Sequence, residues 1–186
     1  ESMIDFTSRK RKGLLKSRMK NHIIICHCPS ENKLVSIVCE LRATQKYSTI
    51  PITVVDDHLE TRPASFQKYG IDFVKGDPTD ENVLMRAGLK RAEGVVILAQ
   101  QPGCPDSDSR SFAIGAVIEM VEDELGRAIK TIAEVISNKS AKLFNRSDID
   151  GSVIIEGISD KMMVQEFLHP GIRKTFEQLL TNTTGS

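Results

Sequence analysis

The sequence contains no tryptophan, and aromatic residues together make up only 5% of it. It also lacks a long apolar run, because the longest, residues 112–121, is interrupted by Glu119 and is shorter than the roughly 18 residues of a membrane span. A secreted protein carries an apolar segment followed by a cleavage site, and we see no such pattern in this sequence. We therefore expect a cytoplasmic location. The remaining composition is ordinary for a soluble domain, with 40% hydrophobic residues that are mostly aliphatic.

The chain has no net charge, since 25 basic residues balance 25 acidic ones. Their distribution is uneven, because Lys and Arg crowd residues 9–20 while Glu1 and Asp5 are the only acids before Glu31. A short basic run beside a neutral body favours a juxtamembrane or surface-anchoring segment, and it argues against a nucleic-acid partner. A solvated, partly disordered N-terminus is the alternative.

Cysteine is scarce, and its spacing is not that of a disulfide framework. Reduced thiols are therefore expected. The run Cys26-His27-Cys28 contains thiolate and imidazole ligands that suit zinc, but no second pair of such ligands lies near it in the sequence. It forms either one edge of a metal site or a pair of thiols at a strand end.

Short apolar runs alternate with longer amphipathic stretches along most of the chain. This alternation is typical of βαβ units, in which helices cover both faces of a parallel sheet. The sequence therefore predicts an α/β fold, a Rossmann-like doubly wound sheet of six parallel strands. The expected strands are residues 22–26, 52–55, 72–74, 94–98, 129–133 and 152–155.

Glycines mark the ends of three expected helices. Gly70, Gly88 and Gly126 each follow a helical stretch and precede a strand, and glycine adopts the left-handed conformation that ends a helix. The helix starts agree with this interpretation. We expect Asp77 to cap a helix that begins at Pro78, and residues 106–109 to open the next helix.

The end of the chain departs from the alternation. Residues 160–168 and 172–180 are predicted helices joined by a sharp turn at 169–171, and they share an apolar stripe. Because exposed apolar patches usually mark interfaces, we expect a C-terminal helix-turn-helix appendage that forms a homodimer through residues 160–180. The expected divisions are a basic linker (1–20), a Rossmann-like lobe (21–157), a helix pair (158–180) and a tail (181–186).

Ligands of open parallel sheets bind beyond the carboxyl ends of the strands, where the strand order reverses. The first turn there, residues 27–32, has no glycine, and Pro29 lacks an amide donor, so we expect an adenine nucleotide to be favoured over NAD. Ser30 and Asn32 would offer donors to an anion at a helix N-terminus. Asp56 would bind the ribose hydroxyls, or would instead be a turn or capping acid.

Three further acids follow strands at the same edge of the predicted sheet: Asp77, Asp106 and Asp108. Their oxygens could bind calcium or another divalent cation, and helix capping is the alternative role. Asp77 is also expected to face the nucleotide cleft. The four histidines are scattered, and the sequence has neither a P-loop nor a nucleophile elbow, so no catalytic set is expected.

Several segments resemble the RCK (regulator of potassium conductance) family, also called the TrkA N-terminal domain family. The Gly-Asp-Pro-Thr element that begins at Gly76 is the most specific of them. The resemblance runs from about residue 21 to 180. The segments that carry it are residues 21–26, 55–56, 73–79, 84–89, 92–98 and 169–172.

The resemblance implies a cytoplasmic gating-ring domain of an inner-membrane potassium channel, in which a nucleotide or divalent cation controls pore opening. Residues 1–20 would then follow the last membrane helix, and residues 160–180 would pair domains that build an octameric ring. Asp56 would bind ribose, and Asp77 a cation. The glycine-free first turn departs from the family pattern and argues against NAD.

Two other functions stay open at this point. One is a soluble regulatory subunit of a potassium transporter. The other is a fragment of an NAD(P)-linked oxidoreductase, which the missing glycines and the absence of a substrate domain in this sequence disfavour.

Overall fold

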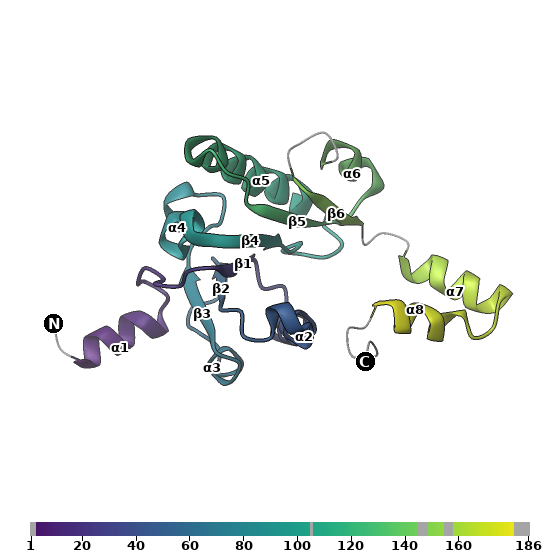
Figure 1. Ribbon diagram of the computed structural model, residues 1–186, viewed down its shortest axis with the longest axis horizontal. Coiled ribbons are helices and arrows are strands. Elements are labelled where there is room, and N and C mark those ends of the chain that lie inside the picture. The colour runs from purple at the N-terminus through teal and green to yellow at the C-terminus, as the bar shows by residue number, and fades with distance from the viewer. Residues whose placement is uncertain (1–2, 105, 145–148, 155–157, 181–186) are drawn as a thin grey trace.

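Six parallel strands form one sheet in the computed structural model, which describes residues 3–104, 106–144, 149–154 and 158–180. The strand order is β3-β2-β1-β4-β5-β6, so the order reverses between β1 and β4 (Figure 1). The Rossmann-like prediction is therefore confirmed. The strands are β1 (His22–Cys26), β2 (Ile52–Asp56), β3 (Ile71–Lys75), β4 (Ala92–Ile97), β5 (Lys130–Val135) and β6 (Gly151–Ile154).

β1 has the predicted bounds, and the other five strands differ from the predicted ones by one or two residues at their ends; residue 155, the predicted end of the sixth strand, lies outside the described residues. β2 includes Asp56, which pairs with Lys75 of β3. β5 extends to Val135 and so includes Glu134. These extensions matter because they place acidic side chains at the carboxyl edge of the sheet.

Helices cover both faces of the sheet (Figure 1). α2 (Glu31–Ala43) and α3 (Ala64–Lys68) pack on one face, and α4 (Glu81–Ala87), α5 (Asp106–Leu125) and α6 (Asn138–Phe144) pack on the other. Side chains of β1 alternate between the two cores, because successive strand residues point to opposite faces. Ile23 and Ile25 join the α2 side, whereas Ile24 and Cys26 join the α5 side. Short 3-10 helices, η1 (Gln45–Tyr47) and η2 (Leu89–Arg91), follow α2 and α4.

The three predicted helix-ending glycines all have positive φ. Gly88 caps α4 at φ 90, and Gly70 and Gly126 both have φ 62. The start of α4 corrects the prediction, since the helix begins at Glu81 with Asp80 as its N-cap. Asp77 instead accepts the backbone N–H of Thr79 at 2.9 Å and its hydroxyl at 2.8 Å. The turn between the end of β3 at Lys75 and the start of α4 at Glu81 includes Asp77, whose carbonyl oxygen accepts the backbone N–H of Asp80.

The N-terminal segment consists of an exposed helix, α1 (Met3–Arg11), and an extended linker segment, residues 12–20. Backbone hydrogen bonds attach the linker segment to β3 and to α4. Gly13 accepts from Lys75 N at 2.9 Å, and Ser17 N donates to Arg86 O at 2.8 Å. The backbone of the linker segment is therefore hydrogen-bonded to the domain, while its basic side chains at Lys12, Lys16, Arg18 and Lys20 are exposed.

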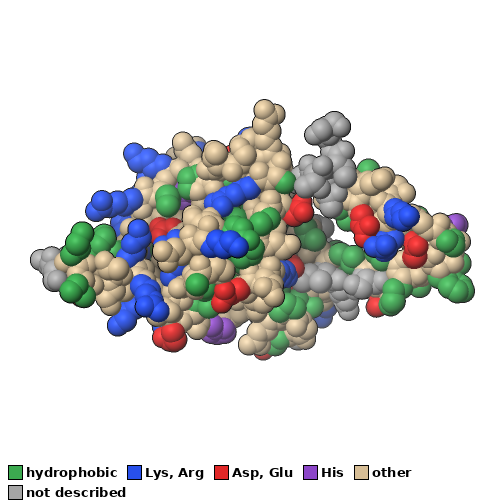
Figure 2. All heavy atoms as spheres, turned by 90° about the horizontal axis from the view of Figure 1, so that it is seen from below, with side chains coloured by type: hydrophobic (Ala, Val, Ile, Leu, Met, Phe, Trp, Pro, Cys, Tyr) green, Lys and Arg blue, Asp and Glu red, His purple; other side chains and the backbone are tan. Residues whose placement is uncertain are grey.

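The C-terminal helices α7 (Ile158–Leu168) and α8 (Ile172–Leu180) form the predicted hairpin and lie beyond β6, apart from the sheet (Figure 1). Hydrophobic side chains are exposed at this end of the molecule (Figure 2). They include Met163, Val164, Phe167, Leu168, Leu179 and Leu180. Within the described residues, no helix has both the length and the hydropathy needed to span a membrane.

Candidate functional site at the carboxyl edge of the sheet

Asp56 ends β2 and holds together two loops at the carboxyl edge. Its side chain is buried, and its carboxylate accepts the backbone N–H groups of Cys28, His58 and Leu59, each at 2.8 Å. Cys28 belongs to the turn after β1, so the bond joins the loops that follow two neighbouring strands. Of the two roles expected for Asp56, these contacts are those of the turn role, and because they use three of the roughly four lone-pair sites of the carboxylate, the ribose role stays a prediction.

His27 occupies the first position of the turn where a dinucleotide-binding domain has glycine. Its backbone adopts φ 70, a left-handed conformation that costs a non-glycine residue about 1–2 kcal/mol. The side chain is 0% exposed, and neither ring nitrogen has a hydrogen-bond partner among the described residues. Burial and the nearby Arg110 charge lower the pKa of His27 to about 4, so its imidazole is neutral at physiological pH.

Arg110 of α5 connects two acids at this edge. Its Nη2 lies 3.1 Å from Asp57 Oδ2 and 3.0 Å from Asp77 Oδ1. Burial opposes ionisation of Asp77, but hydrogen bonds from Thr79 and the charge of Arg110 outweigh it and lower the pKa of Asp77. Arg110 therefore links the loops that follow β2 and β3 through one carboxylate from each.

A second ion pair spans the point where the strand order reverses. Lys33, in the first turn of α2, lies with its Nζ 2.5 Å from Glu134 Oε1 of β5. Glu134 also accepts the backbone N–H of Ala99 at 3.0 Å. The pair therefore bridges from α2 to the β4–β5 side of the edge.

The remaining predicted residues lie at or near this edge in different roles. Ser30 is the N-cap of α2 and accepts the backbone N–H of Lys33 at 3.2 Å, and Asn32 is exposed in the first turn. Asp106 is exposed, whereas Asp108 is buried and accepts the backbone N–H groups of Ile136 and Ser137. Asp77, Asp106 and Asp108 do not form a cation-ligand group among the residues that the structure describes.

The group that does form at this edge was not predicted. His27, Asp56 and Asp57 each offer one ligand atom, and these atoms lie within 4.8 Å of one another. Cys26 does not join them, because its side chain is packed in the core on the α5 side. Burial raises the pKa of the Cys28 thiol to about 12, so that thiol is protonated.

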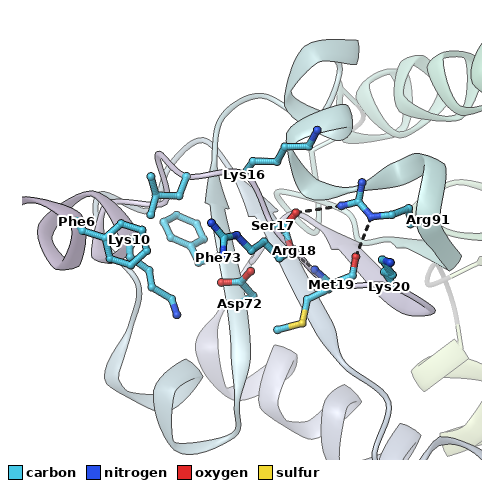
Figure 3. Close-up of a pocket in the computed structure, with 11 residues that line it drawn as sticks. Phe6, Lys10, Lys16, Ser17, Arg18, Met19, Lys20, Asp72, Phe73 and Arg91 are labelled. Carbon is cyan, nitrogen blue, oxygen red and sulfur yellow. Dashed lines mark hydrogen bonds between the residues drawn. The ribbon is translucent and has the colours of Figure 1, made fainter. Parts of the chain in front are cut away.

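A cavity of about 830 Å³ lies at the opposite edge of the sheet, where the linker segment meets β3 (Figure 3). Among the residues that the structure describes, its lining is predominantly basic and apolar, with Asp72 as the one acid. The basic residues are Lys10, Lys16, Arg18, Lys20 and Arg91. The two edges of the sheet therefore differ in charge, with acids concentrated at the carboxyl edge and bases at the amino edge.

A doubly wound parallel sheet whose strand order reverses between β1 and β4 defines a domain of the Rossmann-like fold class. The TrkA-N domain matches residues 31–155, and the chain belongs to that family. The calcium-gated potassium channel TvoK of Thermoplasma volcanium is 23% identical over 175 residues, which cover 94% of this chain and 48% of TvoK. The probable ion channel SYM8 of Pisum sativum is 21% identical over 91% of this chain and 20% of its own length. The chain thus spans half or less of these relatives.

Solved structures share the fold. The TrkA-N domain of the inner membrane protein YbaL from Escherichia coli has a TM-score of 0.59 at 16% identity, covering 80% of this chain and 98% of that one. The RCK domain of GsuK has a TM-score of 0.57 at 16% identity, over 80% of this chain and 30% of GsuK. Further GsuK structures contain ADP or NAD.

Sequence reasoning named His27 only as part of the Cys26-His27-Cys28 run and missed Arg110, Lys33 and Glu134 as members of the site. Arg110 lies 53 positions from Asp57, and Lys33 lies 101 positions from Glu134, so no local motif connects the partners. His27 was visible as a residue that replaces a turn glycine.

Proposed function

We propose that the chain is a regulatory domain of a potassium channel and that an adenine nucleotide bound at the carboxyl edge of the sheet alters pore opening. The curated relatives support the channel assignment, since TvoK is a calcium-gated potassium channel. The observation that carries the nucleotide proposal is the N-terminus of α2, which begins at Glu31 beside the switch point between β1 and β4.

The first turn of α2 suits a phosphate group. Amides at the start of a helix have no intrahelical acceptor, and the helix dipole favours an anion there. The amides of Glu31 and Asn32 are in this position, because the Lys33 amide donates to the Ser30 cap. Lys33 adds a cation at the same end of the helix.

Two features favour a mononucleotide over NAD. The His27 side chain occupies the turn that a dinucleotide pyrophosphate must approach closely, where glycine leaves space. The Lys33–Glu134 ion pair crosses the edge toward β5, where the second nucleoside of a dinucleotide would lie. GsuK has been solved with ADP and with NAD, so a domain of this fold can bind either class of nucleotide.

Assembly follows from the C-terminal helices. We propose that α7 and α8 pair two chains, and that such dimers form a ring beneath a membrane pore joined through residues 1–20. The exposed apolar side chains of α7 and α8 support pairing. A separate subunit of a potassium transporter is the second candidate, and a regulatory rather than catalytic role is common to both.

Calorimetry with ATP, ADP, AMP, NAD and NADH tests the nucleotide proposal. Asn32→Asp adds a negative charge to the first turn of α2 and should weaken the best mononucleotide at least about tenfold, which is 1.4 kcal/mol. Gln45→Glu adds the same charge beyond the other end of α2 and serves as the control. Tighter binding of NAD than of every mononucleotide, or equal affinities of the two variants, would contradict the proposal.

A further inference from the structure

The cluster of His27, Asp56 and Asp57 has the composition of a metal site. His27 comes from the turn after β1, and the two acids come from the end of β2 and the residue after it. Their ligand atoms lie within 4.8 Å of one another. We propose that these three residues bind a divalent transition-metal ion of the zinc class. This proposal goes beyond the nucleotide function, because metal binding requires neither a nucleotide nor a channel.

His27 supplies an observation that is independent of the acids. Its ring is 0% exposed, and neither nitrogen has a hydrogen-bond partner in the described structure. A buried polar group without a partner costs about 1–3 kcal/mol, so native proteins rarely contain one without a reason. A metal ion would satisfy one nitrogen of a ring that already lies beside two carboxylates.

The balance of charges at this edge suits a divalent cation. Asp56, Asp57 and Asp77 contribute three carboxylates, and Arg110 contributes one guanidinium paired with Asp57 and Asp77. Three negative charges minus one positive charge leave two negative charges beside His27. An ion of charge +2 would balance them.

Asp56 is held in position for such a role. Three backbone N–H groups fix its carboxylate from two different loops. A carboxylate has about four lone-pair sites, so these three bonds leave one for a metal ion. Hydrogen bonds of this kind orient the ligands of known metal sites.

The ligand chemistry separates this site from the oxygen-only set expected at Asp77, Asp106 and Asp108. Calcium and magnesium take oxygen ligands almost exclusively. Imidazole nitrogen with carboxylate oxygen suits zinc and neighbouring transition metals. The ion inferred here is therefore a transition metal rather than calcium.

The test uses the whole chain after treatment with a chelator, titrated with zinc, cobalt, calcium or magnesium in the absence of nucleotide. We expect one zinc ion per chain, a higher melting temperature with zinc than with calcium or magnesium, and visible cobalt absorption without a thiolate charge-transfer band. His27→Asn and Asp57→Asn should each weaken zinc at least about tenfold, the loss seen even for outer-shell partners.

His169→Gln is the matched control, because it removes an exposed histidine that lies outside the cluster, on the turn between α7 and α8. It should leave zinc affinity unchanged. If His27→Asn does not fold, Asp57→Asn carries the test, since that side chain is only half-buried and the change keeps its shape. Equal zinc affinity in the parent and in folded variants of His27 and Asp57, a thiolate band, or preference for calcium would overturn the site and leave nucleotide binding a separate question.

Discussion

The carboxylate of Asp56 accepts the backbone N–H of Cys28 at 2.8 Å and so joins the loops after β2 and β1. The same buried carboxylate accepts two amides from its own loop. Asp56→Ala would leave three amides without this acceptor. The loop geometry at the carboxyl edge therefore depends on one side chain.

We expect Asp56→Ala to lower the free energy of unfolding by at least about 2 kcal/mol, because each orphaned buried donor costs about 1–3 kcal/mol. Asp57→Ala should cost less than about 1 kcal/mol, since its ion pair with Arg110 is partly exposed. Urea unfolding of both variants measures the difference. Unchanged stability of Asp56→Ala together with a tenfold loss of nucleotide affinity would restore the ribose role for Asp56.

Gly13 anchors the linker segment to β3, and its φ is 65. A Cβ there would lie 2.6 Å from Lys75 N, so Gly13→Ala combines a strained backbone with a steric clash. Gly70 has nearly the same φ, but a Cβ there would meet no atom within 4 Å, so Gly70→Ala isolates the strain of about 1–2 kcal/mol. Thermal unfolding should show the larger loss for Gly13→Ala. Equal losses in the two variants would mean that the linker segment moves away from the added Cβ without any further loss of stability.

Stability should fall as the pH drops below neutrality. His22 is buried, its Nε2 lies 2.9 Å from Ala87 O, and burial lowers its pKa. As the pH falls through about 6.5, the unfolded chain binds a proton that folded His22 does not, so the free energy of unfolding decreases by at most about 1.36 kcal/mol per pH unit. Denaturation at pH 7 and pH 5 measures this effect.

His22→Gln should show a weaker pH dependence than the parent, because Gln does not titrate. Part of the dependence should remain, since the pKa of His27 is lowered in the same direction. His169→Gln, at an exposed position, is the control and should behave like the parent. A parent-like slope in His22→Gln would show that His22 does not carry the effect.

Association should depend on the C-terminal helices. Phe167 of α7 is 85% exposed, and Phe167→Asp places a charge in the apolar surface that we expect to pair two chains. Light scattering at tens of micromolar should show at least a dimer for the parent and a monomer for Phe167→Asp. Ile4→Asp, an equally exposed position on α1, should associate like the parent. A monomeric parent would exclude pairing by α7 and α8 alone.

Local patterns in the sequence were sufficient for the architecture. A strand of a parallel sheet is covered on both faces and therefore needs a continuous apolar run. Residues 22–26 form such a run and are a buried strand, so this part of the fold could be predicted from the sequence. Gly88 ends its helix because only glycine adopts a left-handed conformation without strain. The family resemblance rested on the same kind of short contiguous element.

The position of Asp77 shows where local reasoning reached its limit. Its sequence context fits a helix cap, and so does that of Asp80 three residues later. The length of the turn after β3 decides between them, and that length depends on where the strand ends against its neighbour. Packing of the sheet therefore made Asp80 the cap and left Asp77 to pair with Arg110.

The sequence by itself determined a parallel α/β domain of the TrkA-N family with its polar groups after the strands, because periodicity and helix-ending glycines act locally. Only the tertiary structure decided which of those groups meet. Pairing of β1 with β2 brings His27 beside Asp57, and α5 carries Arg110 to acids from two other loops. Side-chain direction at a strand end depends on burial and on partners distant in sequence, so the site emerges only when the sheet is assembled.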